Sequence, residues 1–411
     1  MSDASVAPGL PNPADFARPP TASDLARWAE VDASARPARV TRLRARFESA
    51  GIDAYFGLRR ENVRYLTGFV LGEGEERVAG TSGHFLISGA DVLLLADSRY
   101  TVQATAQAPE ARVVDGPRDL APGWADLVAS VGAKRVGVEA ALLPYAVWRR
   151  LEAAAPDVEL VPIEGWVEAD RAIKEPAEIE RVAAACAIAD RALAGLLASI
   201  KPGATERDLA LDLEWRMRTG GAEAVAFDPT CLVGPNAALP HGSPSAAEVR
   251  SGTVVLIDFG AQVDGYRSDM TRTLFVGEPS ERDLAIYGLV ARAQAAAVAQ
   301  IEATIDGELG LPSGRDLHGI ATRLIEADGR FPAFGHGLGH GIGLATHEQP
   351  LLSATALDSS LPSPTVFSVE PGIYVEGETG VRIEDLILLD ADTGRVERLT
   401  KFPRDVFALP D

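Results

Sequence analysis

The sequence predicts an α/β amino-terminal part followed by an α+β part, and two observations carry this prediction. Short apolar runs alternate with helical stretches between residues 39 and 163, which is typical of a mixed or parallel sheet flanked by helices. After residue 174, long Ala-rich helices are combined with two apolar hairpins. A chain of 411 residues exceeds the usual size of one domain, so we expect at least two.

The amino-terminal part begins with residues 1–20, which are rich in Pro and Ala and are expected to be extended or loosely attached. A helix is predicted to open within residues 21–24, with Ser23 or Asp24 as its N-cap. A helical stretch over 39–50 ends at Gly51. Apolar runs then predict strands at 54–57, 84–87, 92–96, 136–138 and 160–162.

The composition changes near residues 170–174, where Lys174-Glu-Pro begins a long Ala-rich helix and Pro176 suits its first turn. We therefore predict an extension at 1–35, a first domain at 36–172 and a second at 173–411. Within the second domain we expect helices near 177–199, 205–219, 281–305 and 315–327, and hairpins at 253–276 and 366–389. The order helix, helix, hairpin occurs twice, which is compatible with two pseudo-equivalent halves.

The charge balance and cysteine content exclude several classes of protein. There are 59 acidic and 39 basic residues, a formal net charge of −20. Nucleic acids and anionic membrane surfaces select patches of Lys and Arg, so we expect neither as a partner. The two cysteines, Cys186 and Cys231, provide no disulfide framework. The start of the chain lacks the basic and apolar regions of a secretory signal, and we predict a cytoplasmic protein.

The first hairpin brings two aspartates to one face. Asp264-Gly265 is a strong hairpin-turn signal. If these two residues form the loop, Asp269 lies opposite Gly260 and shares a face with Asp258, because side chains alternate with period two. If the loop is instead 263–264, the two aspartates are directly opposite. Either register places their Cβ atoms roughly 5–8 Å apart, whereas a three-residue loop without a bulge would separate them.

The second hairpin repeats this arrangement with glutamates. A turn centred on Gly377 places Glu370 opposite Glu384, between apolar neighbours that suit a buried sheet. Asp385, together with Glu376 and Glu378, is interpreted as a solvated turn or edge residue. Four unrelated surface carboxylates are the alternative interpretation of the two pairs. Two matched pairs in apolar surroundings favour a shared site, where the acids would repel one another unless cations neutralised them.

A glycine-rich loop carries half of the histidines. Residues 334–350 contain His336, His340 and His347, of six histidines in all, and five glycines that let the backbone approach a bound group closely. The loop has neither Lys nor Arg, and the phosphate-binding pattern G-x-x-x-x-G-K-[ST] is absent from the sequence. Imidazole beside oxygen donors suits a borderline divalent metal. His241, on a turn-like segment, could reach the same cleft.

The remaining two histidines and the two cysteines do not lie in motifs with other metal-binding or catalytic residue types. We expect His84 and His318 to be structural or exposed. Cys186 lies in an Ala-rich stretch and is expected to be a small core residue. Cys231 has no activating base nearby in the sequence, so a thiol nucleophile is not expected.

Together these motifs resemble the pita-bread metallopeptidases, in particular their proline-specific branch, the Xaa-Pro dipeptidases (prolidases) and Xaa-Pro aminopeptidases. The resemblance covers residues 174–404. Its motifs are Ile-Asp-Phe-Gly, Ser-Asp-Met-Thr-Arg, His-Gly-Leu-Gly-His-Gly-Ile-Gly-Leu-Ala-Thr-His-Glu, Val-Glu-Pro-Gly-Ile-Tyr and Val-Arg-Ile-Glu-Asp. One departure is Thr346, where the family usually has Ile or Val. The earlier part resembles the creatinase-type amino-terminal domain, chiefly through Asn62-Val-Arg-Tyr-Leu-Thr-Gly-Phe.

The resemblance implies two divalent metal ions, Mn first and Co or Zn as alternatives. Asp258 would hold one ion, His340 and Glu370 the other, and Asp269 and Glu384 both. Four carboxylates and two divalent cations sum to zero charge before hydroxide binds. Glu370 resembles the proton shuttle. His241, His336 and His347 resemble residues that position substrate and stabilise an oxyanion, and Arg382 would orient neighbouring groups through its planar fork.

The resemblance implies hydrolysis of Xaa-Pro bonds in short proline-containing peptides by a metal-dependent dipeptidase, in a chain that forms a homodimer. An Xaa-Pro aminopeptidase acting on longer peptides is the alternative. Because a dipeptide has a free carboxylate next to the cleaved bond, we predict that Arg59 or Arg60 pairs with that carboxylate. A non-catalytic pita-bread binding module is a more distant alternative, and the presence of all five ligand types speaks against it.

Overall fold

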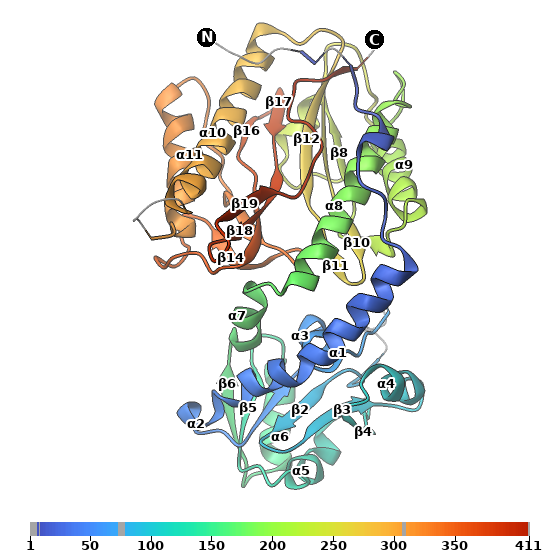
Figure 1. Cartoon of the computed structure of the whole chain (residues 1–411), viewed down its shortest axis with the longest axis vertical. Helices are drawn as coiled ribbons and strands as arrows, with labels where there is room; N and C mark the ends of the chain where they lie inside the picture. The colour runs from blue at the N-terminus through green and yellow to red at the C-terminus, as the bar shows by residue number, and fades with distance from the viewer. Residues whose placement is uncertain (1–5, 8, 73–78, 306–309, 410–411) are drawn as a thin grey trace. The chain divides into compact units, whose positions relative to one another are not determined.

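The computed structural model describes residues 6–7, 9–72, 79–305 and 310–409, and the chain divides into two compact units. The first unit is Ala26–Asp170, and the second combines Met1–Leu25 with Arg171–Asp411 (Figure 1). The division after Asp170 lies two residues before the predicted boundary. The predicted extension, 1–35, is itself divided, because residues 26–35 lie in a helix of the first unit.

The amino-terminal segment is extended but not loose. Val6 forms a parallel bridge with Val406, and the Phe16 ring stacks on the ring of Phe402 with centroids 5.8 Å apart. A guanidinium nitrogen of Arg191 donates to the carbonyl of Pro13 at 2.9 Å, next to the short 3-10 helix η1 (Pro13–Asp15). Apolar contacts and backbone pairing thus attach this segment to the second unit, which the Pro-rich composition did not predict.

The first helices differ from the prediction in their extent and cap. Helix α1 (Ala22–Arg44) continues through Pro37, and a separate short helix α2 (Phe47–Ala50) follows and ends at Gly51, whose φ is 61°. The N-cap is Thr21 rather than Ser23 or Asp24. The Thr21 hydroxyl oxygen accepts from the Asp24 N–H at 3.3 Å, and the Asp24 carboxylate accepts from the Thr21 N–H at 2.9 Å, which is a reciprocal capping pair.

A six-stranded mixed sheet forms the first unit, in the order β4-β3-β2-β1-β5-β6. Its strands are β1 (Ala54–Gly57), β2 (Phe85–Ser88), β3 (Val92–Ala96), β4 (Arg112–Asp115), β5 (Arg135–Glu139) and β6 (Glu159–Ile163). The helices between them are α3 (Arg60–Thr67), α4 (Thr101–Gln107), α5 (Ala121–Ala129), α6 (Tyr145–Ala154) and α7 (Trp166–Ala172). The five predicted strands are present. Strand β4 was not predicted, because it is a partly exposed edge strand whose sequence has no apolar run.

The second unit contains the four predicted long helices, α8 (Pro176–Leu197), α9 (Glu206–Thr219), α10 (Glu281–Ile305) and α11 (Gly314–Asp328). In Figure 1, α10 and α11 lie on one side of the strands and α8 and α9 on the other. Reciprocal Thr205–Asp208 and Ser313–Asp316 capping pairs fix the starts of α9 and α11. The order helix, helix, strands therefore occurs twice, as the sequence suggested.

Four small sheets complete the second unit, with orders β20-β12-β9-β8, β11-β10-β7, β14-β13-β15-β18-β19 and β16-β17. The first two use β7 (Ala224–Val225), β8 (Thr230–Val233), β9 (Val254–Phe259), β10 (Ala261–Val263), β11 (Tyr266–Arg267), β12 (Met270–Val276) and β20 (Ala408–Leu409). The others use β13 (Gly339–Gly341), β14 (Glu348–Leu352), β15 (Thr365–Val369), β16 (Gly372–Val375), β17 (Thr379–Arg382), β18 (Asp385–Asp390) and β19 (Arg395–Arg398). A 3-10 helix, η3 (Gly234–Ala238), follows β8.

The structure has the first of the two registers considered for the first hairpin, and the register predicted for the second hairpin is confirmed. In the first hairpin Val263 pairs with Tyr266, so the loop is Asp264-Gly265, and both loop residues have positive φ, 44° and 77°. In the second hairpin Val369 pairs with Asp385 on one side and Gly372 with Arg382 on the other. Glu370 and Glu384 lie opposite each other in the gap between these two ladders.

Helix α10 is the one helix among the described residues that is long and apolar enough to cross a membrane by length and composition. Half of that apolar window is buried within the structure. Its inner residues, such as Ile286, Val290 and Ala297, belong to a core shared with α11 and with strands of the second hairpin. The helix is therefore accounted for as a core helix of the second unit.

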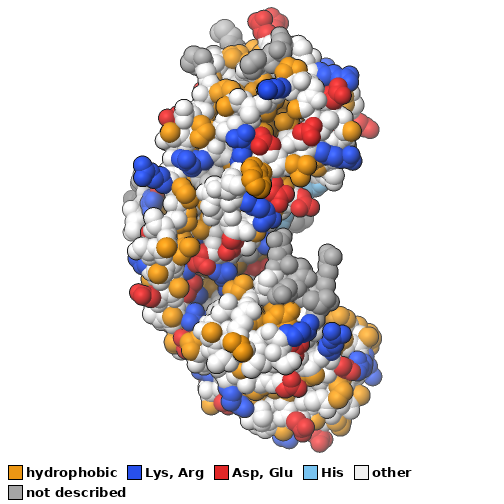
Figure 2. All heavy atoms as spheres, turned by 90° about the vertical axis from the view of Figure 1, so that its right-hand side faces the viewer, with side chains coloured by type: hydrophobic (Ala, Val, Ile, Leu, Met, Phe, Trp, Pro, Cys, Tyr) orange, Lys and Arg blue, Asp and Glu red, His pale blue; other side chains and the backbone are white. Residues whose placement is uncertain are grey.

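On the face shown in Figure 2, acidic and basic side chains are interspersed.

The interpretation of Asp385 as a solvated residue is wrong. Its side chain is 1% exposed and pairs at 2.6 Å with Arg272, which is equally buried. Gln294 and Thr400 also donate to the Asp385 carboxylate. Arg272 in turn donates at 2.6 Å to the backbone carbonyl of Glu384. This ion pair joins the two hairpins, and the sequence did not reveal it because its partners lie 113 residues apart.

We expect Asp385→Ala to lower the free energy of unfolding of the second unit by about 3–5 kcal/mol, because the Arg272 charge would remain buried without its partner. Glu376→Ala is the matched control, since Glu376 is exposed in the turn and its removal should change that free energy by less than about 0.5 kcal/mol. Denaturant unfolding of both variants measures the difference. Equal stability of the two variants would contradict the role of the pair.

Candidate metal and catalytic site

The two hairpins and the glycine-rich loop meet at a cavity of about 740 Å³ within the second unit. Nine of the side chains that the sequence singled out line it: His241, Asp258, Asp269, His336, His340, His347, Glu370, Arg382 and Glu384. These residues come from β9, β12, β13, β17 and the segments next to them. The fold therefore brings together residues that lie up to 143 positions apart in the sequence, from His241 to Glu384.

Hydrogen bonds between β12 and the second hairpin hold the carboxylates in place. The Glu384 N–H donates to the carbonyl of Thr271 at 3.1 Å, and the Thr271 hydroxyl donates to the Glu384 carboxylate at 2.7 Å. The hydroxyl of Thr273 donates to the Arg382 carbonyl at 3.0 Å. Glu384 is thereby fixed next to the strand that begins immediately after Asp269.

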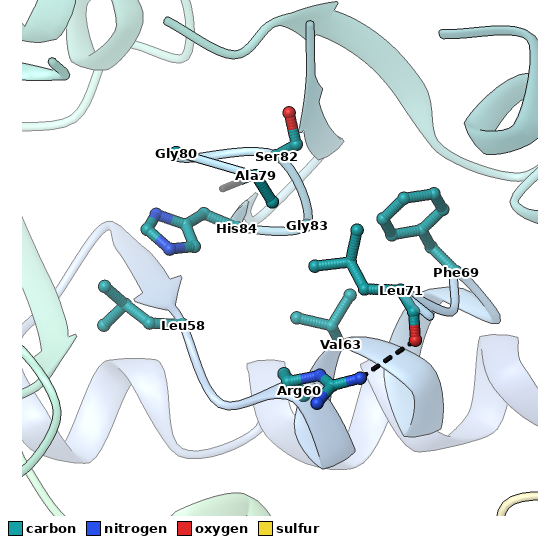
Figure 3. Close-up of a pocket in the computed structure, with 10 residues that line it drawn as sticks. All are labelled: Leu58, Arg60, Val63, Phe69, Leu71, Ala79, Gly80, Ser82, Gly83 and His84. Atoms are coloured by element: carbon teal, nitrogen blue, oxygen red, sulfur yellow. Dashed lines mark hydrogen bonds between the residues drawn. The ribbon is translucent and has the colours of Figure 1, made fainter. Parts of the chain in front are cut away.

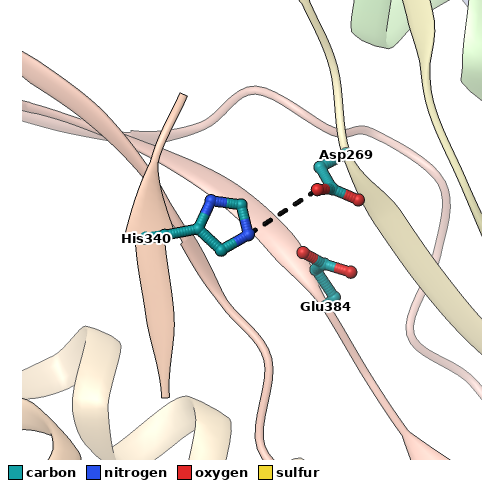
Figure 4. A group of neighbouring side chains, drawn as sticks. All are labelled: Asp269, His340 and Glu384. Atoms are coloured by element: carbon teal, nitrogen blue, oxygen red, sulfur yellow. Dashed lines mark ion pairs between the residues drawn. The ribbon is translucent and has the colours of Figure 1, made fainter. Parts of the chain in front are cut away.

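Asp269, His340 and Glu384 form the tightest cluster in the cavity. Their ligand-type atoms all lie within 4.8 Å of one another, and all three residues are buried. Figure 4 shows both carboxylates facing the edge of the imidazole ring. The Nε2 atom of His340 lies 3.8 Å from an Asp269 oxygen and 3.4 Å from an oxygen of Glu370. Asp258 stands nearby, paired at 2.7 Å with Arg382.

The tautomer of His340 makes this cluster rich in lone pairs. The Nδ1 atom faces the carbonyl of Gly341 at 3.1 Å, and a carbonyl can only accept, so Nδ1 carries the proton. Burial lowers the pKa of His340, so the ring is neutral near pH 7 and Nε2 presents a lone pair. Nε2 and the surrounding carboxylate oxygens therefore repel one another unless a proton or a cation lies between them.

Burial, together with this crowding, raises the pKa values of three carboxylates in the cavity. Burial first, and then the charge of Glu384, raises the pKa of Asp269 well above its ordinary value. Burial and the charge of Glu370 do the same to Glu384, and burial raises the pKa of Glu370 to about 7. One oxygen each of Asp258, Asp269 and Glu384 is buried without a hydrogen-bond partner among the described residues. Oxygen and imidazole donors that converge without protons fit a divalent metal centre.

The glycines beside His340 serve a different purpose from the one expected. A Cβ atom on Gly339 would lie 1.9 Å from the carbonyl oxygen of Ser368, and one on Gly341 would lie 2.1 Å from that of Gln349. Both contacts are with neighbouring backbone in the sheet. The glycines thus allow β13 to fit between β14 and β15 and present His340, rather than leaving room for a bound group.

A chain of hydrogen bonds links His336 to Arg382 through Tyr374, whose role the sequence did not predict. His336 donates from Nδ1 to the Gly337 carbonyl at 2.7 Å, and burial lowers its pKa to about 4, so the ring is neutral. Its Nε2 therefore accepts from the Tyr374 hydroxyl at 2.9 Å, and that hydroxyl oxygen accepts from Arg382 at 2.9 Å. Tyr374 closes the motif Val-Glu-Pro-Gly-Ile-Tyr, which was the only signal for it.

The other two cavity histidines are more open to solvent. His241 lies in the turn after Pro240, and His347 follows the glycine-rich loop. The His347 ring lies 4.2 Å from the His340 ring between centroids, and partial burial together with that ring lowers the pKa of His347 to about 4. Both rings can face a substrate in the cavity.

Arg59 and Arg60 lie in the first unit. Arg59 pairs with Glu168 at 2.7 Å, and Arg60 donates to the carbonyls of Leu71 and Gly72 at 2.9 and 3.2 Å. Arg60 also lines a small cavity of about 60 Å³, mostly apolar, which Figure 3 shows with His84 at its edge. The cavity has space for about two water molecules, and none of its described lining residues is acidic.

The remaining histidines and cysteines are structural. His84 packs edge-on against Phe56, and His318 packs in the same way against Phe334, with centroids 5.7 and 5.5 Å apart. Cys186 and Cys231 are both fully buried, and burial raises the pKa of each thiol. These positions agree with the interpretation of the sequence.

Comparison with known proteins identifies the family. Residues 180–391 match the model of metallopeptidase family M24, and residues 39–173 match the creatinase/prolidase N-terminal domain. The chain belongs to metallopeptidase family M24. A pita-bread catalytic domain that follows a creatinase-type domain was predicted from the motifs, and this prediction is confirmed.

Named relatives cover most of the chain. An Xaa-Pro dipeptidase of Pyrococcus horikoshii is 37% identical over 67% of this chain and 75% of its own length. The structure of an Xaa-Pro dipeptidase from Bacillus anthracis matches with a TM-score of 0.81 and 34% identity, over 91% of this chain and all of the other. An X-Pro aminopeptidase structure from Thermotoga maritima matches with a TM-score of 0.78 and 36% identity, over 90% and 99%.

The raised carboxylate pKa values predict how a metal ion affects stability at different pH. The folded-state pKa of Glu370, about 7, exceeds its ordinary value of 4.5, so its stabilising contribution is present below that ordinary value and is lost as the pH rises through 7. A bound divalent cation removes this loss because it favours the ionised carboxylates. We expect added Mn²⁺ to raise the unfolding temperature of the chelated protein more at about pH 8 than at about pH 5.

Differential scanning calorimetry of the chelated and the Mn²⁺-loaded protein at both pH values measures this gain. The variant Glu384→Gln, which removes one buried negative charge, should reduce the gain at the higher pH. A gain that is independent of pH, or unaffected by the substitution, would show that the ions bind elsewhere.

Proposed function

We propose that this protein is an Xaa-Pro dipeptidase that uses two divalent metal ions. The observation that carries the proposal is the convergence of Asp269, His340 and Glu384 within 4.8 Å, next to Asp258 and Glu370, in a buried cavity. The relatives named Xaa-Pro dipeptidases support the substrate class. An Xaa-Pro bond has no N–H, so a cavity for this bond need not offer an acceptor for one.

Each proposed ligand has an oxygen or nitrogen available for an ion. Asp258 would hold one ion, His340 and Glu370 the other, and Asp269 and Glu384 would contact both, with the unpartnered oxygens of Asp258, Asp269 and Glu384 as donors. When bound, two divalent ions would acidify a water molecule and polarise the scissile carbonyl. Four carboxylates would balance the charge of two such ions, and Arg382, which pairs with Asp258 at 2.7 Å, would add one positive charge beside them.

Glu370 is proposed as the proton shuttle. Its carboxylate lines the cavity and has an oxygen 3.4 Å from Nε2 of His340, so it lies beside the proposed ions, where an ionised carboxylate can act as a general base. The hydroxyl of Ser368 donates to its carboxylate at 3.0 Å and holds the side chain toward His340. Glu370 would take a proton from the attacking water and transfer it to the proline nitrogen as the bond breaks.

The proposed roles of the histidines differ from one another. Both nitrogens of His336 are engaged, one with Gly337 and the other with Tyr374, so His336 would orient Tyr374 and Arg382 rather than stabilise an oxyanion. His241 and His347 line the open part of the cavity and are the proposed donors to the substrate carbonyl. A neutral imidazole, such as that of His347, can donate from one nitrogen.

Three further features remain proposals. We propose Mn²⁺ as the native ion, with Co²⁺ and Zn²⁺ as alternatives, because the donor set combines carboxylates with one imidazole. We propose a homodimer on the family resemblance alone. We propose a cytoplasmic location, which two buried cysteines without a disulfide support.

An Xaa-Pro aminopeptidase is the second candidate, because the Thermotoga maritima structure with that name is about as similar as the dipeptidase structures. The two candidates differ in the length of the peptide. A dipeptidase needs a group that binds the free carboxylate next to the cleaved bond, whereas an aminopeptidase has to leave room for further residues.

We expect the chelated protein to hydrolyse Ala-Pro only after a divalent metal is restored, and to prefer Ala-Pro to Ala-Pro-Ala. Glu370→Gln should lower kcat by at least about 100-fold, because it removes a general base and one ligand. Glu376→Gln, in the exposed turn, is the control and should keep full activity. Release of proline measures all of these rates.

A preference for the tripeptide would favour the aminopeptidase. Absence of cleavage with every metal would instead favour a binding module that has kept its ligands.

A further inference from the structure

We propose that Glu348 is a positioning residue that holds the His347 imidazole beside the proposed metal ligands. It does so through a buried ion cluster with Arg171 and Lys174. This inference rests on the proposed function, in which His347 donates to the substrate carbonyl, and deepens it. Glu348 directly follows His347 and opens β14. The family resemblance assigned no role to any of the three residues of this cluster.

The His347 ring has no polar anchor of its own. No described residue forms a hydrogen bond with either nitrogen of this ring, which instead packs against the ring of His340 with centroids 4.2 Å apart. Its position therefore depends on the backbone on either side. On the amino-terminal side, the hydroxyl of Thr346 donates to the Ala226 carbonyl at 3.3 Å. On the carboxyl-terminal side, the backbone is fixed by the side chain of Glu348.

The Glu348 carboxylate is surrounded by donors. One oxygen accepts from the Ala345 N–H at 2.8 Å and pairs with a guanidinium nitrogen of Arg171. The other oxygen accepts from Nζ of Lys174 at 2.8 Å. The three charged side chains are between 1% and 4% exposed. Burial alone would raise the pKa of Glu348, but Lys174 and Arg171 lower it to about 2, so the carboxylate is ionised at neutral pH.

The two cations are themselves held in place within the second unit. Arg171 lies near the end of α7, and Lys174 lies two residues before α8. The Lys174 N–H donates to the carbonyl of Pro364, next to β15, at 2.8 Å, and its Nζ donates to the Arg171 carbonyl. Glu348 lies 177 and 174 positions away from these partners in the sequence. The cluster thus ties the start of β14 to fixed and distant segments.

The loop that carries His347 is closed around this cluster. Gly341 pairs with Glu348 in the β13–β14 ladder, so the loop returns to the strand that presents His340. A Cβ atom on Gly343 would lie 2.9 Å from a carboxylate oxygen of Glu348, which means that the loop backbone passes directly over the buried acid. The spacing of the two imidazole rings therefore follows from the position of this carboxylate.

The position of an imidazole matters for catalysis. A donor aimed at the oxygen on which charge develops acts without reorganisation, and a misplacement of about 1 Å can cost on the order of 100-fold in rate. Glutamine in place of Glu348 would leave two buried cations without their negative partner. Aspartate would keep the charge, but it is one methylene shorter and cannot keep the Ala345 and Lys174 contacts without a backbone shift. Both substitutions should therefore displace His347.

The test is a double-mutant cycle on the metal-loaded full chain, with release of proline from Ala-Pro as the readout. We expect Glu348→Gln and Glu348→Asp each to lower kcat by roughly 10–100-fold while KM stays within about threefold of the wild-type value. In the His347→Ala background the same substitutions should cause little further loss, because Glu348 acts through His347.

Glu397→Gln is the matched control. Glu397 likewise pairs with an arginine and a lysine, Arg395 and Lys401, but it lies on β19 and does not line the cavity. This variant should keep the kcat of the wild type. Lys174→Met, which leaves the Arg171–Glu348 pair in place, takes the place of the Glu348 variants in the cycle if neither of them folds.

Several outcomes would overturn the proposal. Additive losses in the cycle would mean that Glu348 supports the cavity as a whole, and wild-type kcat in the Glu348 variants would remove its role. A loss of more than about tenfold in Mn²⁺ affinity, measured by calorimetric titration, would assign the effect to His340. If the wild-type protein cleaves no peptide, the proposed hydrolysis fails, and a crystal structure of Glu348→Asp decides the positioning. A displaced His347 ring would support it, and an unmoved ring would overturn it.

Discussion

The structure of the second unit depends on one electrostatic constraint, the crowding of lone pairs in a buried cavity. The carboxylates of Asp269, Glu370 and Glu384 and the unprotonated Nε2 of His340 converge there, and raised carboxylate pKa values follow from burial and mutual repulsion. Such groups are unfavourable in a low-dielectric interior unless cations lie among them. Folding has to assemble this arrangement from distant segments and hold it against its own repulsion.

Two hairpins carry out this assembly, each supported by apolar cores that do not involve the acids. Thr271 and Thr273 of β12 donate to Glu384 and to the Arg382 carbonyl in the second hairpin. The ion pair between Arg272 and Asp385 lies directly behind Glu384. Glycines let β13 pass between its neighbours and present His340. Repulsion within the site is thus opposed by hydrogen bonds and by an ion pair outside it, and the ligands cannot move apart.

Local rules of the sequence were sufficient for the features that depend on neighbouring residues. The Asp264-Gly265 signal predicted the position of the first turn to within one residue, and period-two alternation placed the acids of each hairpin on one face in either register. Features that depend on distant partners were missed. The burial of Asp385 was not predicted because its partner Arg272 lies far away in the sequence. The attachment of the amino-terminal segment was not predicted because Phe402 and Val406 are near the other end of the chain. The link through Tyr374 is equally non-local.

Anomalous scattering from crystals of the Mn²⁺-loaded protein shows whether divalent cations lie among these carboxylates. We expect two anomalous peaks roughly 3.5–4 Å apart. One should contact Asp258, the other His340 and Glu370, and both should contact Asp269 and Glu384. Crystals that show no manganese peak beside these five side chains would contradict this expectation.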